Sequence, residues 1–278
     1  MEWMLGLALV CLSQGQIGPN PTQDELSDLT RQTVILRSAG RVDQALETAK
    51  KALALANRLP NDPSGLETRS YLHTLTGILS DEKGIRVEAE IHFLKAVELQ
   101  KTISGHNSDS HAGALLNLAT SRMLRGRHDL AEGNLVTALE ILSGNFPESH
   151  PLRLSCHGRL TSLYMAEGRN GLAIHHGKLL LGLLRASTGK DSLQVVGLEN
   201  TLANVLMAEG KVKEARSLAQ SALETLETKL GKTHPATLKQ LELLAKILLA
   251  EGDGESAAKI FDRIENTIDS MEALAKAY

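Results

Sequence analysis

Apolar residues recur at helical spacing through most of the chain, and short turn signals separate the segments that carry them. Residues 198–222 show the pattern most clearly. The first segment has one apolar face, and the second has small residues at intervals of three and four that allow helices to pack closely. These positions are Leu198, Leu202, Val205 and Leu206, followed by Ala215, Ala219 and Ala222. The pattern predicts two antiparallel helices joined at Gly210, where glycine tolerates a left-handed backbone.

The same plan recurs along the chain with a period of 42 residues. Each predicted turn contains a glycine that is followed five residues later by an alanine. The glycines are Gly84, Gly126, Gly168, Gly210 and Gly252, and Gly40 precedes them by 44 residues. The alanines are Ala45, Ala89, Ala131, Ala173, Ala215 and Ala257. A fixed period in this range indicates one structural unit copied in tandem.

The repeats divide the chain into four parts. Residues 16–23 contain two prolines and are predicted to form a linker, and the repeat array is predicted for residues 24–265. Residues 266–278 are predicted to form a short C-terminal capping helix, because a terminal repeat lacks a neighbour on one side.

The N-terminus lies outside the repeat pattern. Trp3 to Leu12 is an unbroken apolar run, shorter than the roughly 20 residues of a membrane-spanning helix. Its length suits the core of a signal peptide covering residues 1–15, which would make the protein secreted or periplasmic. The absence of Lys and Arg before it favours the alternative, an apolar helix over the first repeat of a cytoplasmic protein.

Composition excludes several functional classes. The net charge is −3, from 30 basic and 33 acidic residues, so no global field recruits nucleic acid. Aromatic residues make up 3% of the chain and supply few stacking platforms for bases. The two cysteines, Cys11 and Cys156, build neither a disulfide framework nor a zinc site. No membrane span, metal site or cofactor is therefore expected.

Several motifs resemble the tetratricopeptide repeat. The pairs Leu118–Ala119, Leu202–Ala203 and Leu244–Ala245 begin eight residues before a turn glycine and resemble the core of that repeat. The 42-residue period and the loop Gly231-Lys232-Thr233-His234-Pro235 resemble the longer repeats of the kinesin light chain class. The resemblance covers residues 28–265 and implies an all-α, right-handed α-solenoid, or superhelix, of about six helix-turn-helix repeats.

Proteins that resemble this chain bind extended peptides or helices in a concave groove lined by the first helix of each repeat. One row of residues maps onto that groove. Met123, Met165 and Met207 each lie three residues before a turn glycine, and Leu249 takes the position in the sixth repeat. Methionine is common on adaptable binding surfaces and is also a filler of irregular cores, so partner contact and packing both remain open.

A second groove row is polar. Asn117 and Asn200 match the two asparagines of a Leu-Asn-Asn-Leu-Ala pattern that, in kinesin light chain repeats, clamps the backbone of a bound peptide. Amide side chains both donate and accept hydrogen bonds, which suits that task. Repeat four departs from the pattern at Gly158–Arg159, and repeat six at Glu242–Leu243. The other predicted groove residues are Thr120, Arg159, Ser162, Asn204 and Lys246.

Candidate catalytic motifs have simpler explanations. His175 and His176 are adjacent and therefore point in different directions on a helix. Residues 231–233 copy the end of a phosphate-binding loop, but Leu226 stands where its first glycine belongs. Cys156 precedes His157, although a nucleophile needs its base nearby in space rather than in sequence.

These observations predict a non-catalytic scaffold that binds a peptide segment or partner protein in the groove. The alternative is an accessory or regulatory domain for a separately encoded enzyme, one that could respond to a ligand.

Overall fold

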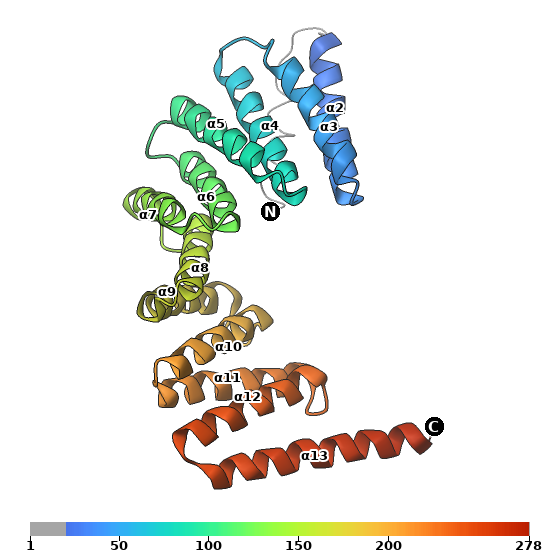
Figure 1. Ribbon diagram of the computed structural model, residues 1–278, viewed down its shortest axis with the longest axis vertical. Coiled ribbons are helices and arrows are strands. Elements are labelled where there is room, and N and C mark those ends of the chain that lie inside the picture. Colours follow the sequence, from blue (N-terminus) through green and yellow to red (C-terminus); the bar gives the residue numbers. More distant parts are fainter. Residues whose placement is uncertain (1–20, 278) are drawn as a thin grey trace. The chain divides into compact units, whose positions relative to one another are not determined.

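The computed structural model describes the backbone of residues 21–277 and the side chains of residues 23–270. The predicted signal peptide at residues 1–15 and the first part of the predicted linker lie outside this range. Every secondary-structure element in the described range is an α-helix, and the helices follow one another through short turns (Figure 1). Contacts divide the chain into two compact units, which meet between Cys156 and His157.

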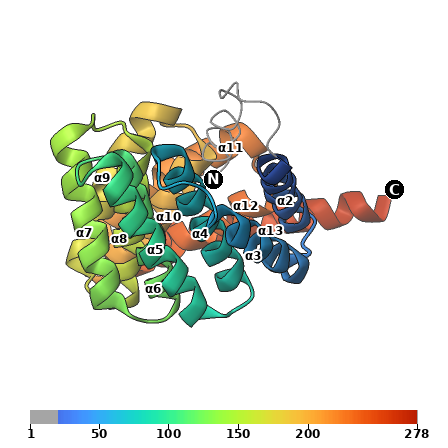
Figure 2. The ribbon, with the colours of Figure 1, turned by 90° about the horizontal axis from the view of Figure 1, so that it is seen from above.

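The first unit contains three helix pairs. Each helix packs against the next one in sequence, as α4 and α5 do in both views (Figures 1 and 2). The helices are α2 (Pro21–Ser38), α3 (Val42–Ala56), α4 (Pro63–Glu82), α5 (Arg86–Ser104), α6 (Asp109–Leu124) and α7 (His128–Asn145). The boundary with the second unit falls within α8 (Pro151–Ala166).

The second unit continues the pairing from the C-terminal half of α8. The remaining helices are α9 (Asn170–Thr188), α10 (Leu193–Ala208), α11 (Val212–Leu230), α12 (Pro235–Glu251) and α13 (Gly254–Ala277). None of the described helices is long and apolar enough to cross a bilayer.

The periodic glycines close each helix pair in the same way. All six have a left-handed backbone, with φ between 69° and 89°. In the third pair, the amide of Gly126 donates to the carbonyl of Met123 and the next amide, that of Arg127, donates to the carbonyl of Arg122. These two bonds form a Schellman motif, which satisfies carbonyls left free at a helix end. The other five turns repeat both bonds, so the glycine ladder is a ladder of helix caps.

The periodic alanines form the centre of each pair. All six have no exposed surface. A larger side chain at these positions would hold the first helix away from the second. Leu202 and Leu244 on the first helices are also buried. The small residues predicted to permit close approach are therefore fully enclosed by the helix pairs.

The connections between pairs are capped by residues that also follow the period. Ser108 and Ser192 accept hydrogen bonds from the amides of His111 and Val195. His150 and His234 occupy the same repeat position, and each accepts a bond through Nδ1 from the amide two residues later. The His-Pro pairs are thus helix N-caps, with proline at the first helical position.

Two predicted boundaries differ from the structure. Helix α2 begins at Pro21, so the last three residues of the predicted linker are helical; proline suits this position because its fixed φ matches the first turn of a helix. The predicted capping helix at residues 266–278 is not separate but continues α13, because neither glycine nor proline interrupts the chain after Gly254.

Substitution of Gly177 in α9 tests how closely the helices pack at this position. An added Cβ atom would lie 2.4 Å from Cδ2 of the fully buried Leu202. We expect Gly177→Ala to lower the free energy of unfolding by about 1–3 kcal/mol, because the core must shift to admit it. Gly182→Ala on the same helix meets nothing within 4 Å and should raise stability by about 0.5–1 kcal/mol. Urea denaturation measures both, and equal effects would contradict the packing.

Candidate functional site

The predicted groove residues all lie on first helices, but the structure assigns them to two units. The first unit holds Asn117, Thr120 and Met123 on α6, whereas the second unit holds the other seven. Those seven are Arg159, Ser162 and Met165 on α8, Asn200, Asn204 and Met207 on α10, and Lys246 on α12. The second unit therefore carries the larger part of the predicted surface.

In the second unit, the exposed residues of the first helices recur at the repeat period of 42 residues. Gly197, Asn204 and Ala208 of α10 are exposed, and Asn200 is half-buried between them. One period later, the corresponding residues of α12 are all exposed: Lys239, Glu242, Lys246 and Ala250. Ser162 and Ala166 continue the row on α8. We call this set the open stripe of the second unit.

The two asparagines of α10 are bonded differently from the hydroxyl groups in the row. Ser162 donates to the carbonyl of Gly158, so its proton is already used within its own helix. The Nδ2 of Asn204 donates to the carbonyl of Asn200 at 2.9 Å. The Oδ1 atom of Asn200 is buried and has no hydrogen-bond partner among the described residues. A buried acceptor without a donor costs about 1–3 kcal/mol.

The methionine row lies at the helix ends. The carbonyls of Met123, Met165 and Met207 each accept the amide of the following turn glycine, at 3.0–3.1 Å. All three side chains are half-buried, whereas Leu249 at the same position in the last pair is 54% exposed. Half-burial leaves part of each methionine packed and part open, so the row remains a predicted contact surface.

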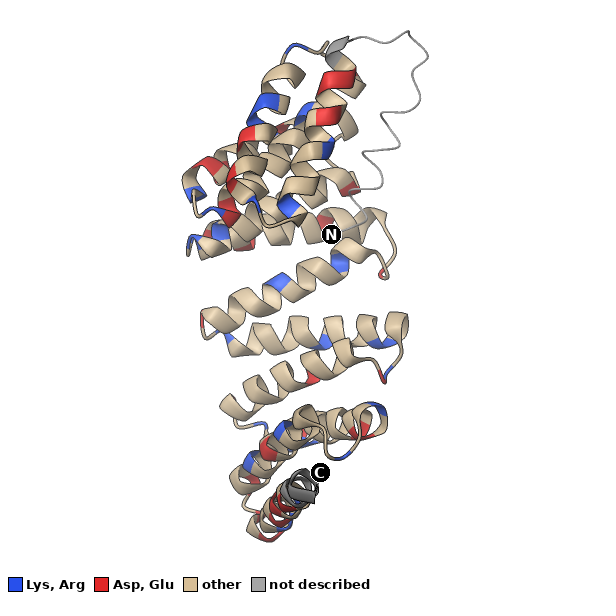
Figure 3. Ribbon diagram, turned by 90° about the vertical axis from the view of Figure 1, so that its right-hand side faces the viewer, with Lys and Arg blue, Asp and Glu red and all other residues tan. Residues whose placement is uncertain are grey.

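Charges on the open stripe come mainly from α12. Lys239 and Lys246 lie on either side of Glu242, and no ion pair within the described part of the chain involves any of the three. The exposed positions of α10 between Leu193 and Ala208 carry no charge. Over the described helices as a whole, acidic and basic residues are interspersed (Figure 3).

A buried carboxylate lies behind the stripe and was not predicted. Glu199 on α10 has no exposed surface and accepts hydrogen bonds from Arg185 at 2.5 Å and Ser221 at 2.8 Å. It thereby links α10 to the helices on either side. The sequence signal was a glutamate at a position where Leu241 stands one repeat later.

The first unit contains a larger charge cluster that was also not predicted. Glu90 on α5 is 8% exposed and pairs with Arg122 at 3.0 Å, Arg127 at 3.1 Å and Arg125. Burial alone would raise the pKa of Glu90, but the hydrogen bond from Arg122 and the three guanidinium charges outweigh it and lower that pKa. The cluster joins the second helix pair to the third.

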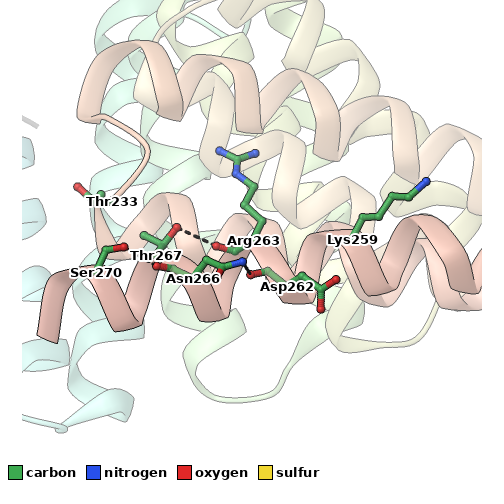
Figure 4. A pocket seen from close by; sticks show the side chains of 7 residues that line it. All are labelled: Thr233, Lys259, Asp262, Arg263, Asn266, Thr267 and Ser270. Atoms are coloured by element: carbon green, nitrogen blue, oxygen red, sulfur yellow. Dashed lines mark hydrogen bonds between the residues drawn. The ribbon is translucent and has the colours of Figure 1, made fainter. Parts of the chain in front are cut away.

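A shallow, open hollow lies between α13 and the loop before α12, with Thr233 on the loop side (Figure 4). Its polar groups are largely occupied within the protein. Asn266 and Thr267 donate to the carbonyls of Asp262 and Arg263, and Arg263 pairs with Glu227. The hollow thus offers few free groups to a small ligand.

The candidate catalytic motifs have structural roles. Gly231 ends α11 with φ of 92°, and its carbonyl accepts the hydroxyl of Thr237, so residues 231–233 form a loop between helices. Nδ1 of His111 lies 2.8 Å from the carbonyl of His106. Cys156 is buried. Among the described residues, no three His, Cys, Asp or Glu side chains come together as metal ligands.

Comparison with known proteins agrees with this architecture. Residues 194–278, which span α10 to α13, match the tetratricopeptide repeat family model. None of the curated proteins matches the sequence. The fold is similar to that of BtubC (BKLC) from P. vanneervenii, with 20% identity, a TM-score of 0.67, and coverage of 83% of this chain and 92% of the other.

Two further structures resemble the chain. One contains the nearly identical TPR-like repeats of a putative kinesin light chain from Podosopora anserina, with 21% identity, a TM-score of 0.63, and coverage of 77% of this chain and 100% of the other. The other is PilF from Pseudomonas aeruginosa, with 15% identity, a TM-score of 0.58, and coverage of 92% and 100%. The predicted all-α solenoid of tetratricopeptide-like repeats, similar to those of kinesin light chains, is confirmed.

The Glu90 cluster yields a prediction for stability. We expect Glu90→Ala to lower the free energy of unfolding by about 2–3 kcal/mol, because three guanidinium groups lose their buried counter-charge. Glu98→Ala on the same helix is the control: it removes an exposed partner of Lys95 and should leave stability unchanged. Chemical denaturation at neutral pH measures the free energy of unfolding of both variants. Similar losses of stability would show that the cluster contributes no more than an exposed ion pair.

Proposed function

We propose that the protein is a non-catalytic scaffold and that the open stripe of the second unit binds a peptide segment or a partner protein. Tetratricopeptide repeats generally mediate protein–protein interaction. The finer assignment, to this stripe and these residues, is our inference.

The row of residues that stays exposed on consecutive first helices is the observation that carries the proposal, because burial dominates the other faces of these helices. An extended peptide presents one amide donor per residue, and the exposed Asn204 has a side-chain oxygen that can accept from one of them. Asn200, half-buried beside it, has an amide oxygen that lies below the surface and has no hydrogen-bond partner among the described residues.

The apolar part of a partner would meet the methionines. Met165 and Met207 are half-buried at the ends of α8 and α10, where a flexible side chain can adapt to different surfaces. Lys246 and Arg159 belong to the same predicted surface and add positive charge. A segment bound here would combine backbone hydrogen bonds with apolar contacts, as peptides bound to folded domains commonly do.

Binding can be tested with a pair of matched double variants. The test variant, Asn204→Ala with Lys246→Glu, changes two exposed residues of the stripe. The control, Gln220→Ala with Lys213→Glu, makes the same kinds of change at exposed positions of α11. Partners recovered with the wild-type protein from its native cells should be lost from the test variant and kept by the control.

Met165→Asp combined with Asn200→Ala extends the test to the half-buried part of the surface. It places a charge where an apolar contact is proposed and removes the unpartnered acceptor. Circular dichroism verifies that each variant is folded. Unchanged recovery of every partner by both this variant and the Asn204→Ala, Lys246→Glu variant would refute the assignment to this surface.

A further inference from the structure

Two pairs of histidines connect the first and second helices of repeats two and four. In repeat two, Nδ1 of His73 on α4 lies 2.9 Å from Nδ1 of His92 on α5. In repeat four, Nδ1 of His157 on α8 lies 3.0 Å from Nδ1 of His176 on α9. Each position recurs two periods later along the ladder, so the same contact is built twice at equivalent sites.

The orientation of the rings identifies the contact as a direct hydrogen bond. The ring centres are 5.2 Å apart in both pairs. The separation of the ring centres exceeds the separation of the two Nδ1 atoms by about twice the distance from a ring nitrogen to its own ring centre. Both Nδ1 atoms therefore lie close to the line that joins the two ring centres. Two imidazoles bound to one tetrahedral zinc ion would hold their nitrogens about 3.3 Å apart, which is farther than in either pair.

A bond between two Nδ1 atoms requires different tautomers. One ring must carry a proton on Nδ1 and the other must leave Nδ1 bare. In repeat two, Nε2 of His92 lies 3.8 Å from a carboxylate oxygen of Glu88, which favours a proton on Nε2. His73 then donates from Nδ1, and Nδ1 of His92 accepts.

Burial and the nearby cationic groups oppose added positive charge on this pair, whereas Glu88 favours it. Burial, followed by the charges of His92, Lys95 and Arg69, lowers the pKa of His73 to about 4. Burial also lowers the pKa of His92; Glu88 opposes this shift, and Lys50 from α3 supports it. The facing charged groups are thus Arg69 on α4, Glu88 and Lys95 on α5, and Lys50 on α3.

The pair in repeat four has aromatic and cationic neighbours. The ring of Tyr164 stacks on His176 with centres 5.6 Å apart, and the guanidinium of Arg169 lies 4.5 Å from the centre of that tyrosine ring. The ring of His175 meets His176 edge-on at 5.1 Å. His157 itself is buried.

We propose that the two histidine pairs are acid-sensitive clasps that join the first and second helices of repeats two and four. A clasp is closed while one Nδ1 atom of the pair carries a proton and the other is bare. In repeat two, a first proton from solvent can bind Nε2 of His73 and leave the bond in place. A second proton must bind Nδ1 of His92, the acceptor, and so breaks the bond and sets two positive rings against each other.

The direction of the pH dependence follows from proton linkage. In the unfolded chain, histidine binds a proton near pH 6.5, whereas His73 in the folded protein stays neutral until about pH 4. Between these values the unfolded state holds more protons, so stability falls as the pH falls. One extra proton changes the unfolding equilibrium constant by about tenfold per pH unit.

The chain supplies its own control for this proposal. Repeat six has Leu241 and Ile260 at the positions of His73 and His92, so the repeat accepts an apolar pair there. The double variant His73→Leu with His92→Ile removes both titrating groups and keeps a pair the fold already uses. The pair in repeat four remains in both proteins and cancels in the comparison.

Urea unfolding of the wild type and the double variant at intervals from pH 7.5 to pH 4.5 measures the difference. We expect the unfolding constant of the wild type to rise, relative to the variant, as the pH falls below 6.5. The slope should approach about tenfold per pH unit from His73 alone, and His92 should add to it. Parallel pH profiles would overturn the proposal.

Nitrogen NMR of the wild-type imidazoles provides a test that does not depend on the variant. At neutral pH, one Nδ1 atom of the pair should be protonated and the other bare, and both rings should titrate below pH 6.5, with His73 the lower at a pKa of about 4. Independent titration of His73 and His92 near pH 6.5, with equal tautomer populations, would also overturn the proposal.

Discussion

The left-handed glycine at the end of each first helix is the constraint on which the remaining structure depends. It places two amides under the helix end, satisfies two carbonyls, and reverses the chain within a few residues. The alanine five residues later then faces the helix just completed, with no exposed surface. Most other residues at the turn would need a strained backbone that costs about 1–3 kcal/mol, and this strain would recur in every repeat. Glycine removes that cost six times with one local solution.

The backbone turn is the same in every repeat. The repeats therefore differ mainly in the side chains that lie between their two helices. The positions occupied by His73 and His92 hold Leu115 and Asn134 in repeat three and Leu241 and Ile260 in repeat six. The Nδ2 atom of Asn134 is buried with no hydrogen-bond partner in the described range. Repeat five has Glu199 at the first of the two positions and neutralises it with Arg185 from the preceding helix. Helix pairs of one geometry thus contain apolar, amide, imidazole and ionic contacts.

The turns are constant, whereas the side-chain contacts between helices vary from repeat to repeat. This explains which features could be predicted from the sequence. The turns, the buried alanines and the order of the helices depend on local rules for glycine and on apolar spacing, and the sequence predicted them. The Glu90 cluster could not be predicted, because its three arginines belong to the next helix pair and nothing in their local spacing indicates the contact. The histidine pairs left a signal, since both members recur two periods apart, but only coordinates show the nitrogens facing each other. The end of the array was misjudged for a local reason: α13 has no stop signal after Gly254.

For the candidate surface, the periodic glycines predicted which residues share a helix face. They did not predict which polar atoms of these residues are already hydrogen-bonded. The register placed Asn200, Asn204 and Lys246 on one row, and they do lie on the open side of α10 and α12. Their chemistry depends on hydrogen bonds within the helix, which occupy Ser162 and one donor of Asn204 and leave the oxygen of Asn200 unpartnered within the described residues. An array of this kind has no single enclosed core, so the proposed binding would draw on many shallow contacts along consecutive helices. In such a row, the exposed amide of Asn204 and the charge of Lys246 would contribute more to specificity than to affinity, because a partner that leaves them unpaired on binding would be penalised.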